Sequence, residues 1–131
     1  MNLDLLATCL RDRLPGLLAI YLFGSHAADK AGPESDLDLA ILLADKIDPV
    51  GLWTLADELV DMAGCPVDLV DLRTATTVLQ YQIMMTGRRL WTRDHRAPLY
   101  ESFILSEKTA LDEARAPLLE IIRQEGSIHG R

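Results

Sequence analysis

Apolar residues recur along the chain with two different periods, and the change of period separates predicted helices from predicted strands. Leucines follow a helical spacing through residues 3–14, and Pro15 closes that segment. The sequence therefore predicts an amphipathic helix at its start. Residues 17–23, "LLAIYLF", are then continuously apolar up to a glycine. Their short length and strand-favouring side chains predict a buried β-strand.

The rest of the chain repeats this alternation. Further strands are predicted at residues 36–43, 66–72 and 88–92, the last at an edge of the sheet. Further helices are predicted at residues 48–64, 74–87 and about 97–125, with a break at Pro117. A short helix capped by Ser25 is expected after the first strand, and Trp53 is expected to pack against the core. The pattern as a whole predicts an α+β fold, a small β-sheet with helices outside it.

Length, charge and cysteine content narrow the range of functions. With 131 residues, 49% of them hydrophobic, residues 1–131 are predicted to form a single domain. The formal net charge of -7 repels phosphates, so direct nucleic-acid binding is not expected. Cys9 and Cys65 lack a zinc-binding spacing, and no segment has the pattern of a signal peptide or a membrane span. We therefore expect a cytoplasmic protein with free thiols and no membrane contact.

Two carboxylates stand at the start of the second predicted strand. Asp36 and Asp38 are two residues apart in "DLDLAILL", so in a strand they point to the same face while the leucines between them enter the other. Side by side, two carboxylates repel each other, and they are stable at a sheet rim or when they share a cation. Mg²⁺ or Mn²⁺ fits best, because these ions prefer carboxylate oxygens and keep positions open for phosphate.

A third acid on a neighbouring strand completes many sites for phosphoryl or nucleotidyl transfer. The segment "VDLVDL" offers Asp68 and Asp71, which strand alternation directs to opposite faces. We favour Asp68, since a carboxylate inside an otherwise apolar strand needs a partner more than one at the strand end. Pairing of Asp68 with Arg73 is the structural alternative.

A Gly-Ser pair precedes these acids. Gly24 and Ser25 follow the first predicted strand, and ten residues separate them from Asp36. A glycine at such a junction lets the backbone approach a phosphate closely, and a serine at the start of a helix offers hydroxyl and amide donors. Each signal is weak alone, but together they indicate a nucleotide site.

This combination of "GS", "DLD" and "VDLVDL" resembles the minimal nucleotidyltransferases of the DNA polymerase beta superfamily, often called MNT or MntA-type antitoxins. The resemblance covers roughly residues 17–92, the predicted core. It implies a mixed β-sheet and the polymerase beta-like nucleotidyltransferase fold. Carried over, Gly24 and Ser25 would bind the phosphates of the nucleotide. Asp36 and Asp38 would hold both metal ions, and Asp68 would bind a metal ion and help deprotonate the acceptor hydroxyl.

The resemblance also implies a partner. MntA-type proteins are typically paired with a HEPN-domain ribonuclease toxin, which they neutralise by transferring AMP from ATP to a toxin tyrosine. The implied cofactor is Mg²⁺ or Mn²⁺, and ATP is the implied substrate. Little chain remains after the three acids to build an acceptor-binding domain, so the acceptor is expected to come from another molecule. An antibiotic-modifying nucleotidyltransferase would share the metal site but needs that added domain.

One departure from the family pattern concerns the residues after Gly-Ser. Family members often place a small residue and then arginine there, whereas this chain has His26 and Ala27, with Lys30 as the nearest cation. Weaker nucleotide binding is one expected consequence. A non-catalytic antitoxin that silences its partner by occlusion is the alternative function.

Two further features carry open interpretations. His26 is interpreted either as an exposed, inert loop residue or as a ligand contact. The basic residues near the last strand are interpreted either as a solvated edge or as a contact for phosphates or for an acidic partner, and they are Arg88, Arg89, Arg93 and Arg96.

Overall fold

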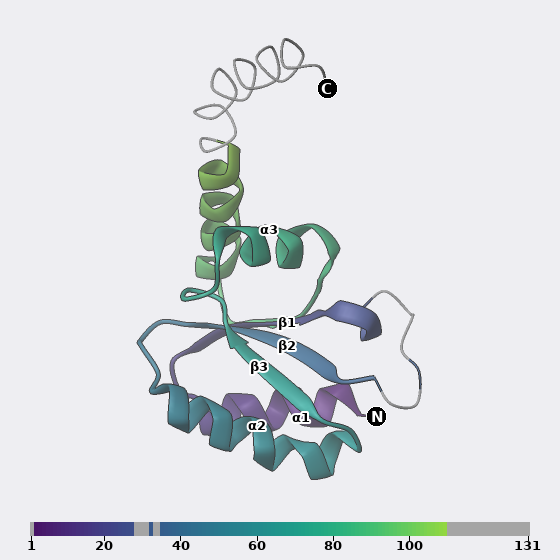
Figure 1. Cartoon of the computed structure of the whole chain (residues 1–131). Helices are drawn as coiled ribbons and strands as arrows, with labels where there is room; N and C mark the ends of the chain where they lie inside the picture. Colours follow the sequence, from purple (N-terminus) through teal and green to yellow (C-terminus); the bar gives the residue numbers. More distant parts are fainter. Residues whose placement is uncertain (1, 28–31, 33–34, 110–131) are drawn as a thin grey trace, which may run out of the picture.

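The computed structural model describes residues 2–27, 32 and 35–109, and it contains the predicted strands and helices (Figure 1). The strands are β1 (Leu17–Phe23), β2 (Leu37–Leu43), β3 (Val67–Asp71) and β4 (Arg88–Thr92). The helices are α1 (Leu3–Arg13), the short 3₁₀ helix η1 (Gly24–His26), α2 (Pro49–Ala63) and α3 (Thr77–Thr86). A C-terminal helix runs through residues 96–109. The remainder of the predicted segment to residue 125, including the break at Pro117, lies outside the described residues.

The strands form one mixed sheet in the order β3-β2-β1-β4. β1 is antiparallel to both β2 and β4, whereas β2 and β3 are parallel. Parallel neighbours need a crossover connection, and α2 provides it between β2 and β3. The prediction of an α+β fold with a small mixed sheet is confirmed, and β4 is an edge strand as predicted.

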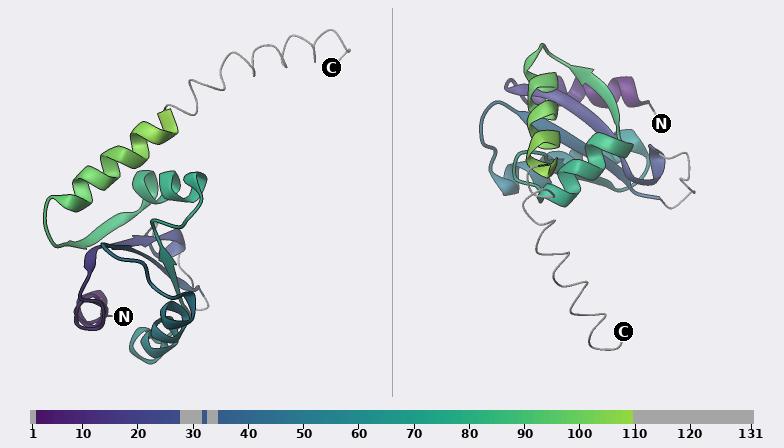
Figure 2. Two further views of the ribbon diagram at one scale, coloured as in Figure 1. Left: turned by 90° about the vertical axis from the view of Figure 1, so that its left-hand side faces the viewer. Right: turned by 90° about the horizontal axis from the view of Figure 1, so that it is seen from above.

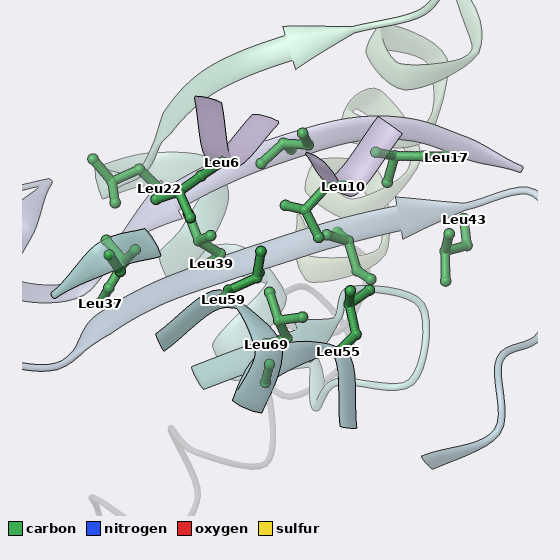
Figure 3. Packing of buried hydrophobic residues seen from close by; sticks show 14 residues of the cluster. Leu6, Leu10, Leu17, Leu22, Leu37, Leu39, Leu43, Leu55, Leu59 and Leu69 are labelled. Carbon is green, nitrogen blue, oxygen red and sulfur yellow. The ribbon is translucent and has the colours of Figure 1, made fainter. Parts of the chain in front are cut away.

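Helices cover both faces of the sheet (Figures 1 and 2). α1 and α2 lie against one face, where leucines of both helices and of the strands form the first apolar cluster (Figure 3). α3 and the C-terminal helix lie on the opposite face, where Ile83, Ala97 and Ile104 join Ala40 and Leu42 of β2 in the second cluster. Alternate residues of β2 therefore enter opposite clusters, as strand geometry requires.

The helix ends follow from local capping. Asn2 accepts a hydrogen bond from the amide of Leu5 at the start of α1. At α2, Asp48 accepts from the amide of Val50, Pro49 occupies the first helical position, and Gly64 ends the helix with a φ of 75°. Glycine adopts this left-handed conformation without steric cost. The predicted bounds of α2 were set by the same residues.

Two sequence predictions of local structure are wrong. Ser25 does not cap a helix, because η1 already begins at Gly24 and has no side-chain cap. The rest of that predicted helix, residues 28–31, lies outside the described residues. Trp53 does not pack in the core, since 78% of its surface is exposed. Its neighbour Leu52 contacts the first cluster instead.

Both cysteines agree with the expectation of free thiols. Cys9 and Cys65 are free thiols that pack against the first cluster. Within the part of the chain that the structure describes, no helix is long and apolar enough to cross a membrane.

Candidate functional site

Parallel pairing of β2 with β3 brings two of the predicted site acids side by side. Asp38 is the register partner of Asp68, and paired residues of neighbouring strands point to the same face about 4.8 Å apart along the hydrogen-bonding direction. Leu37 and Leu39, which flank Asp38, are buried on the α1–α2 face. The two carboxylates therefore project from the opposite face, which carries α3.

Electrostatics tie Asp36 to the same group. Burial raises the pKa of the Asp38 carboxyl, and the nearby charges of Asp68 and then Asp36 raise it further. Asp38 is half-buried, while Asp36 and Asp68 are exposed at the rim of the sheet. Asp36 and Asp68 thus both lie close enough to repel the charge of Asp38, and the three acids together concentrate negative charge at one end of β2 and β3.

Gly24 fits against this group so closely that a side chain at this position would have to displace the Asp38 carboxylate. A Cβ atom at position 24 would overlap Oδ2 of Asp38 and lie 3.1 Å from its Cγ. The backbone at Gly24 also has a φ of +74°, which favours glycine. The Gly-Ser turn follows β1 directly, where Phe23 pairs with Asp38. The predicted phosphate-binding turn and the predicted metal ligands therefore meet at one place.

The next residues of the turn also contact β2. Ser25 and His26 are half-buried in η1. Nε2 of His26 lies 3.4 Å from the carbonyl oxygen of Ser35, the residue before Asp36, and the His26 ring partly offsets the rise in the pKa of Asp38. His26 is therefore not an exposed, inert loop residue.

The contacts of Arg73 show whether it pairs with Asp68, the structural alternative to a role of Asp68 in the site. Its guanidinium donates to the carbonyl oxygens of Leu43 and Ala44, and its amide donates to Oδ1 of Asp71. Asp71 is buried with 9% exposed surface and serves the turn after β3. No ion pair between Arg73 and Asp68 is found among the described residues.

The reason given for favouring Asp68 over Asp71 is wrong. β3 is an edge strand, and Asp68 is exposed instead of enclosed by apolar neighbours. Its distinguishing property is register, because it stands directly beside Asp38.

Three of the four basic residues near β4 are engaged in contacts within the chain. Arg89 pairs with Glu101 of the C-terminal helix at 3.1 Å, and Arg96 pairs with Asp94 at 2.8 Å. Arg93 donates to the carbonyl oxygens of Leu17 and Pro15. Three of the four arginines thus hold structural contacts, and Arg88 is exposed at the sheet edge.

Comparison with known proteins identifies the family. The model of the family "Polymerase beta, Nucleotidyltransferase" matches residues 7–96. The chain belongs to this nucleotidyltransferase family. A relative from Shewanella oneidensis, "Protein adenylyltransferase MntA", is 36% identical over 120 residues, which cover 92% of this chain and 86% of the relative.

Solved structures of the family have the same fold. A toxin–antitoxin crystal structure with AMP-PNP matches with a TM-score of 0.83 and 35% identity, covering 94% of this chain and 99% of the other. A second contains the tri-AMPylated Shewanella oneidensis HEPN toxin in complex with MNT antitoxin. It matches with a TM-score of 0.74 and 34% identity, covering 92% and 94% of the two chains. The predicted resemblance and fold are confirmed.

Proposed function

We propose that this chain is an antitoxin that transfers AMP from ATP to a tyrosine hydroxyl of a HEPN-type ribonuclease toxin and thereby neutralises it. The observation that carries the proposal is the register of Asp38 beside Asp68, with Gly24 packed against Asp38. The relative at 36% identity bears the name of a protein adenylyltransferase. Related complexes contain AMP-PNP in one case and an AMPylated HEPN toxin in another. A hetero-oligomer with the toxin is the corresponding assembly.

The proposed chemistry assigns one task to each part of the site. The amides and hydroxyl of the Gly24–Ser25 turn hold the triphosphate. The acceptor oxygen attacks the α-phosphorus of ATP, the bond from that phosphorus to the bridging oxygen breaks, and pyrophosphate leaves. The proton of the acceptor hydroxyl passes to Asp68, which acts as the general base. Asp36 and Asp38 would hold the divalent metal ions that neutralise the phosphates.

Divalent metal ions complete the proposed site. Asp36, Asp38 and Asp68 supply only carboxylate oxygens, the donors that Mg²⁺ and Mn²⁺ prefer. Burial, and then the repulsion of Asp68 and Asp36, raise the pKa of Asp38, and a bound cation would relieve this unfavourable charge. No preformed group of three such ligands occurs within residues 2–27, 32 and 35–109. When bound, the metal ions would neutralise the triphosphate and activate the acceptor oxygen.

The remaining proposals concern the whole chain. We infer that residues 1–131 act as one minimal nucleotidyltransferase domain, with a core of about residues 17–92. A cytoplasmic location is in keeping with the free thiols of Cys9 and Cys65.

Removal of two carboxylates tests the mechanism. The double variant Asp36→Asn, Asp38→Asn is expected to fold normally and to lose transfer of labelled AMP to a partner HEPN toxin. Transfer is followed by the label and by the intact mass of the toxin, with Mg²⁺ present or removed by chelation. The matched control is Asp57→Asn, Asp61→Asn, which removes two exposed carboxylates of α2 and is expected to transfer AMP at the wild-type rate.

A cell-based measurement separates catalysis from occlusion. Toxin and antitoxin are expressed together, and growth is compared for the wild type and the double variant of Asp36 and Asp38. Loss of protection is expected. Retained transfer by the variant in vitro would overturn the assigned acids, and full protection without transfer would establish the occlusion alternative.

A further inference from the structure

His26 connects the Gly-Ser turn to the chain segment that leads into β2. Its ring is half-buried, and its Nε2 lies 3.4 Å from the carbonyl oxygen of Ser35. A carbonyl oxygen can only accept a hydrogen bond, so Nε2 carries the proton and donates it. Ser35 is the residue directly before Asp36. The bond therefore joins the predicted phosphate-binding turn to the first predicted metal ligand.

Ser35 also makes two hydrogen bonds to Gly32. The amide of Gly32 donates to Oγ of Ser35 at 2.9 Å, and the amide of Ser35 donates back to the carbonyl oxygen of Gly32 at 3.1 Å. These two bonds restrict the freedom of Ser35, whose carbonyl oxygen faces His26.

Position 27 cannot take over this task. Ala27 is half-buried and packs against the first apolar cluster, so it faces the layer of α1 and α2. Within residues 24–27, His26 is the one residue whose side chain has a ring N–H or can carry a positive charge, and so can donate a hydrogen bond in this way. The arginine expected after Gly-Ser is absent, and the contact with Ser35, just before β2, is made by His26.

We propose that His26 is a positioning residue for nucleotide binding, whose Nε2–H donor holds the Gly24–Ser25 turn at a fixed separation from Asp36. The proposal rests on the proposed function in one respect, that the ligand is a nucleoside triphosphate. The triphosphate has to reach both the amides of the turn and the carboxylates of β2. If this separation is fixed, the site is preorganised before ATP binds. Preorganisation lowers the entropic cost of binding.

Two substitutions separate the donor from the shape of the ring. His26→Gln keeps an N–H donor on a side chain of similar reach but cannot carry a charge. His26→Phe keeps a flat ring but has no donor. Affinity for AMP-PNP is measured by titration calorimetry with Mg²⁺ and without toxin. We expect His26→Gln to bind within about threefold of the wild type. His26→Phe should bind about tenfold more weakly, as expected for loss of about 1.4 kcal/mol.

The outcomes distinguish this proposal from the proposed function. Equal weakening in both variants would mean that His26 acts as a cation on phosphate, and unchanged binding in both would mean that the contact has no role; either result overturns the proposal. A wild-type chain that does not bind AMP-PNP would instead overturn the proposed function. Thermal unfolding of each variant checks the fold, and His26→Ala replaces His26→Phe if the phenyl ring prevents folding.

Discussion

At the scale of single residues, Gly24 links backbone conformation to the chemistry of the site. Its positive φ and its contact with Asp38 are independent reasons for glycine. Gly64 at the end of α2 has nearly the same φ, +75°, but nothing lies within 4 Å of a Cβ atom there. The two glycines can therefore be compared directly. Both have a positive φ, but a side chain would meet Asp38 at position 24 and nothing at position 64.

This pair gives a prediction for Gly24→Ala and Gly64→Ala. Both variants place a side chain in the left-handed region, which costs on the order of 1 kcal/mol of unfolding free energy. Only Gly24→Ala also displaces the Asp38 carboxylate, so we expect it to lose AMP transfer while Gly64→Ala retains it. Urea denaturation gives the stability of each variant, and toxin labelling gives its transfer. Equal transfer by the two variants would contradict the assigned contact.

Sequence reasoning reached the site acids through spacing alone. The spacing predicted that Asp36 lies near Asp38, and the charge of Asp36 does act on Asp38, although β2 begins only at Leu37. The choice of Asp68 was right about its proximity to Asp38 but wrong about its burial, because a single sequence does not reveal which strand stands at the edge. The contact between Gly24 and Asp38 could not be predicted, since it depends on how the turn folds back over β2.

At the scale of elements, the attachment of the C-terminal helix depends on a polar contact within an apolar layer. The hydroxyl of Tyr21, a residue of β1 with 3% exposed surface, donates to Oε2 of Glu101 at 2.6 Å. Oε1 of Glu101 accepts from Arg89 of β4 at 3.1 Å. One carboxylate of the helix thus binds two strands of the sheet. Around it, Ala97 and Ile104 are buried in the second cluster.

Substitution of Glu101 should lower the unfolding free energy more than substitution of Tyr21. Tyr21→Phe removes one hydrogen bond and leaves Glu101 paired with Arg89, at a cost of about 1 kcal/mol of unfolding free energy. Glu101→Ala leaves the buried Tyr21 hydroxyl without its partner and is expected to cost about 1–3 kcal/mol. Arg96→Ala, which breaks an exposed pair with Asp94, is the control and should change stability by less than about 0.5 kcal/mol. Chemical denaturation at neutral pH measures all three.

The same tyrosine makes stability depend on alkaline pH. Burial, and then the hydrogen bond and charge of Glu101, raise the pKa of Tyr21 above its ordinary value of 10.0. A group whose pKa is raised by folding stabilises the folded state below its unfolded pKa, and this contribution declines as pH rises above that value. The unfolding free energy is therefore expected to fall above about pH 10, and to fall less steeply in Tyr21→Phe. Parallel slopes for the two proteins would contradict this role of Tyr21.

Helix and strand boundaries were predictable where capping residues are explicit. Asp48, Pro49 and Gly64 define α2 in the sequence and in the structure. The exposure of Trp53, which was predicted to be buried, follows from its position around the axis of α2. The buried stripe of α2 runs through Leu55 and Leu59, with Leu52 one turn before them, and Trp53 is rotated about 100° from Leu52 around the helix axis. The helical period therefore places Trp53 outside the buried stripe, on the solvent-facing side of α2.

At the scale of the whole molecule, the distribution of charge determines which partners can bind. The formal net charge is -7, and Arg89, Arg93 and Arg96 are engaged in internal contacts. A surface of this kind repels the phosphate backbone of nucleic acids. Neither RNA nor duplex DNA should be retained in a mobility-shift assay at physiological salt. Binding that weakens steeply with added salt would reveal a basic surface and contradict the prediction.

The parallel pairing of β2 with β3 also determines when the chain can become active during its own synthesis. Asp36 and Asp38 leave the ribosome first, and Asp68 follows only after the whole of α2. A parallel pair cannot form as a local hairpin, so β3 reaches its place beside β2 only through this crossover. A nascent chain therefore carries the nucleotide turn and two carboxylates well before its third. If Asp68 is required for transfer, protection against the toxin begins only once this late step of folding is complete.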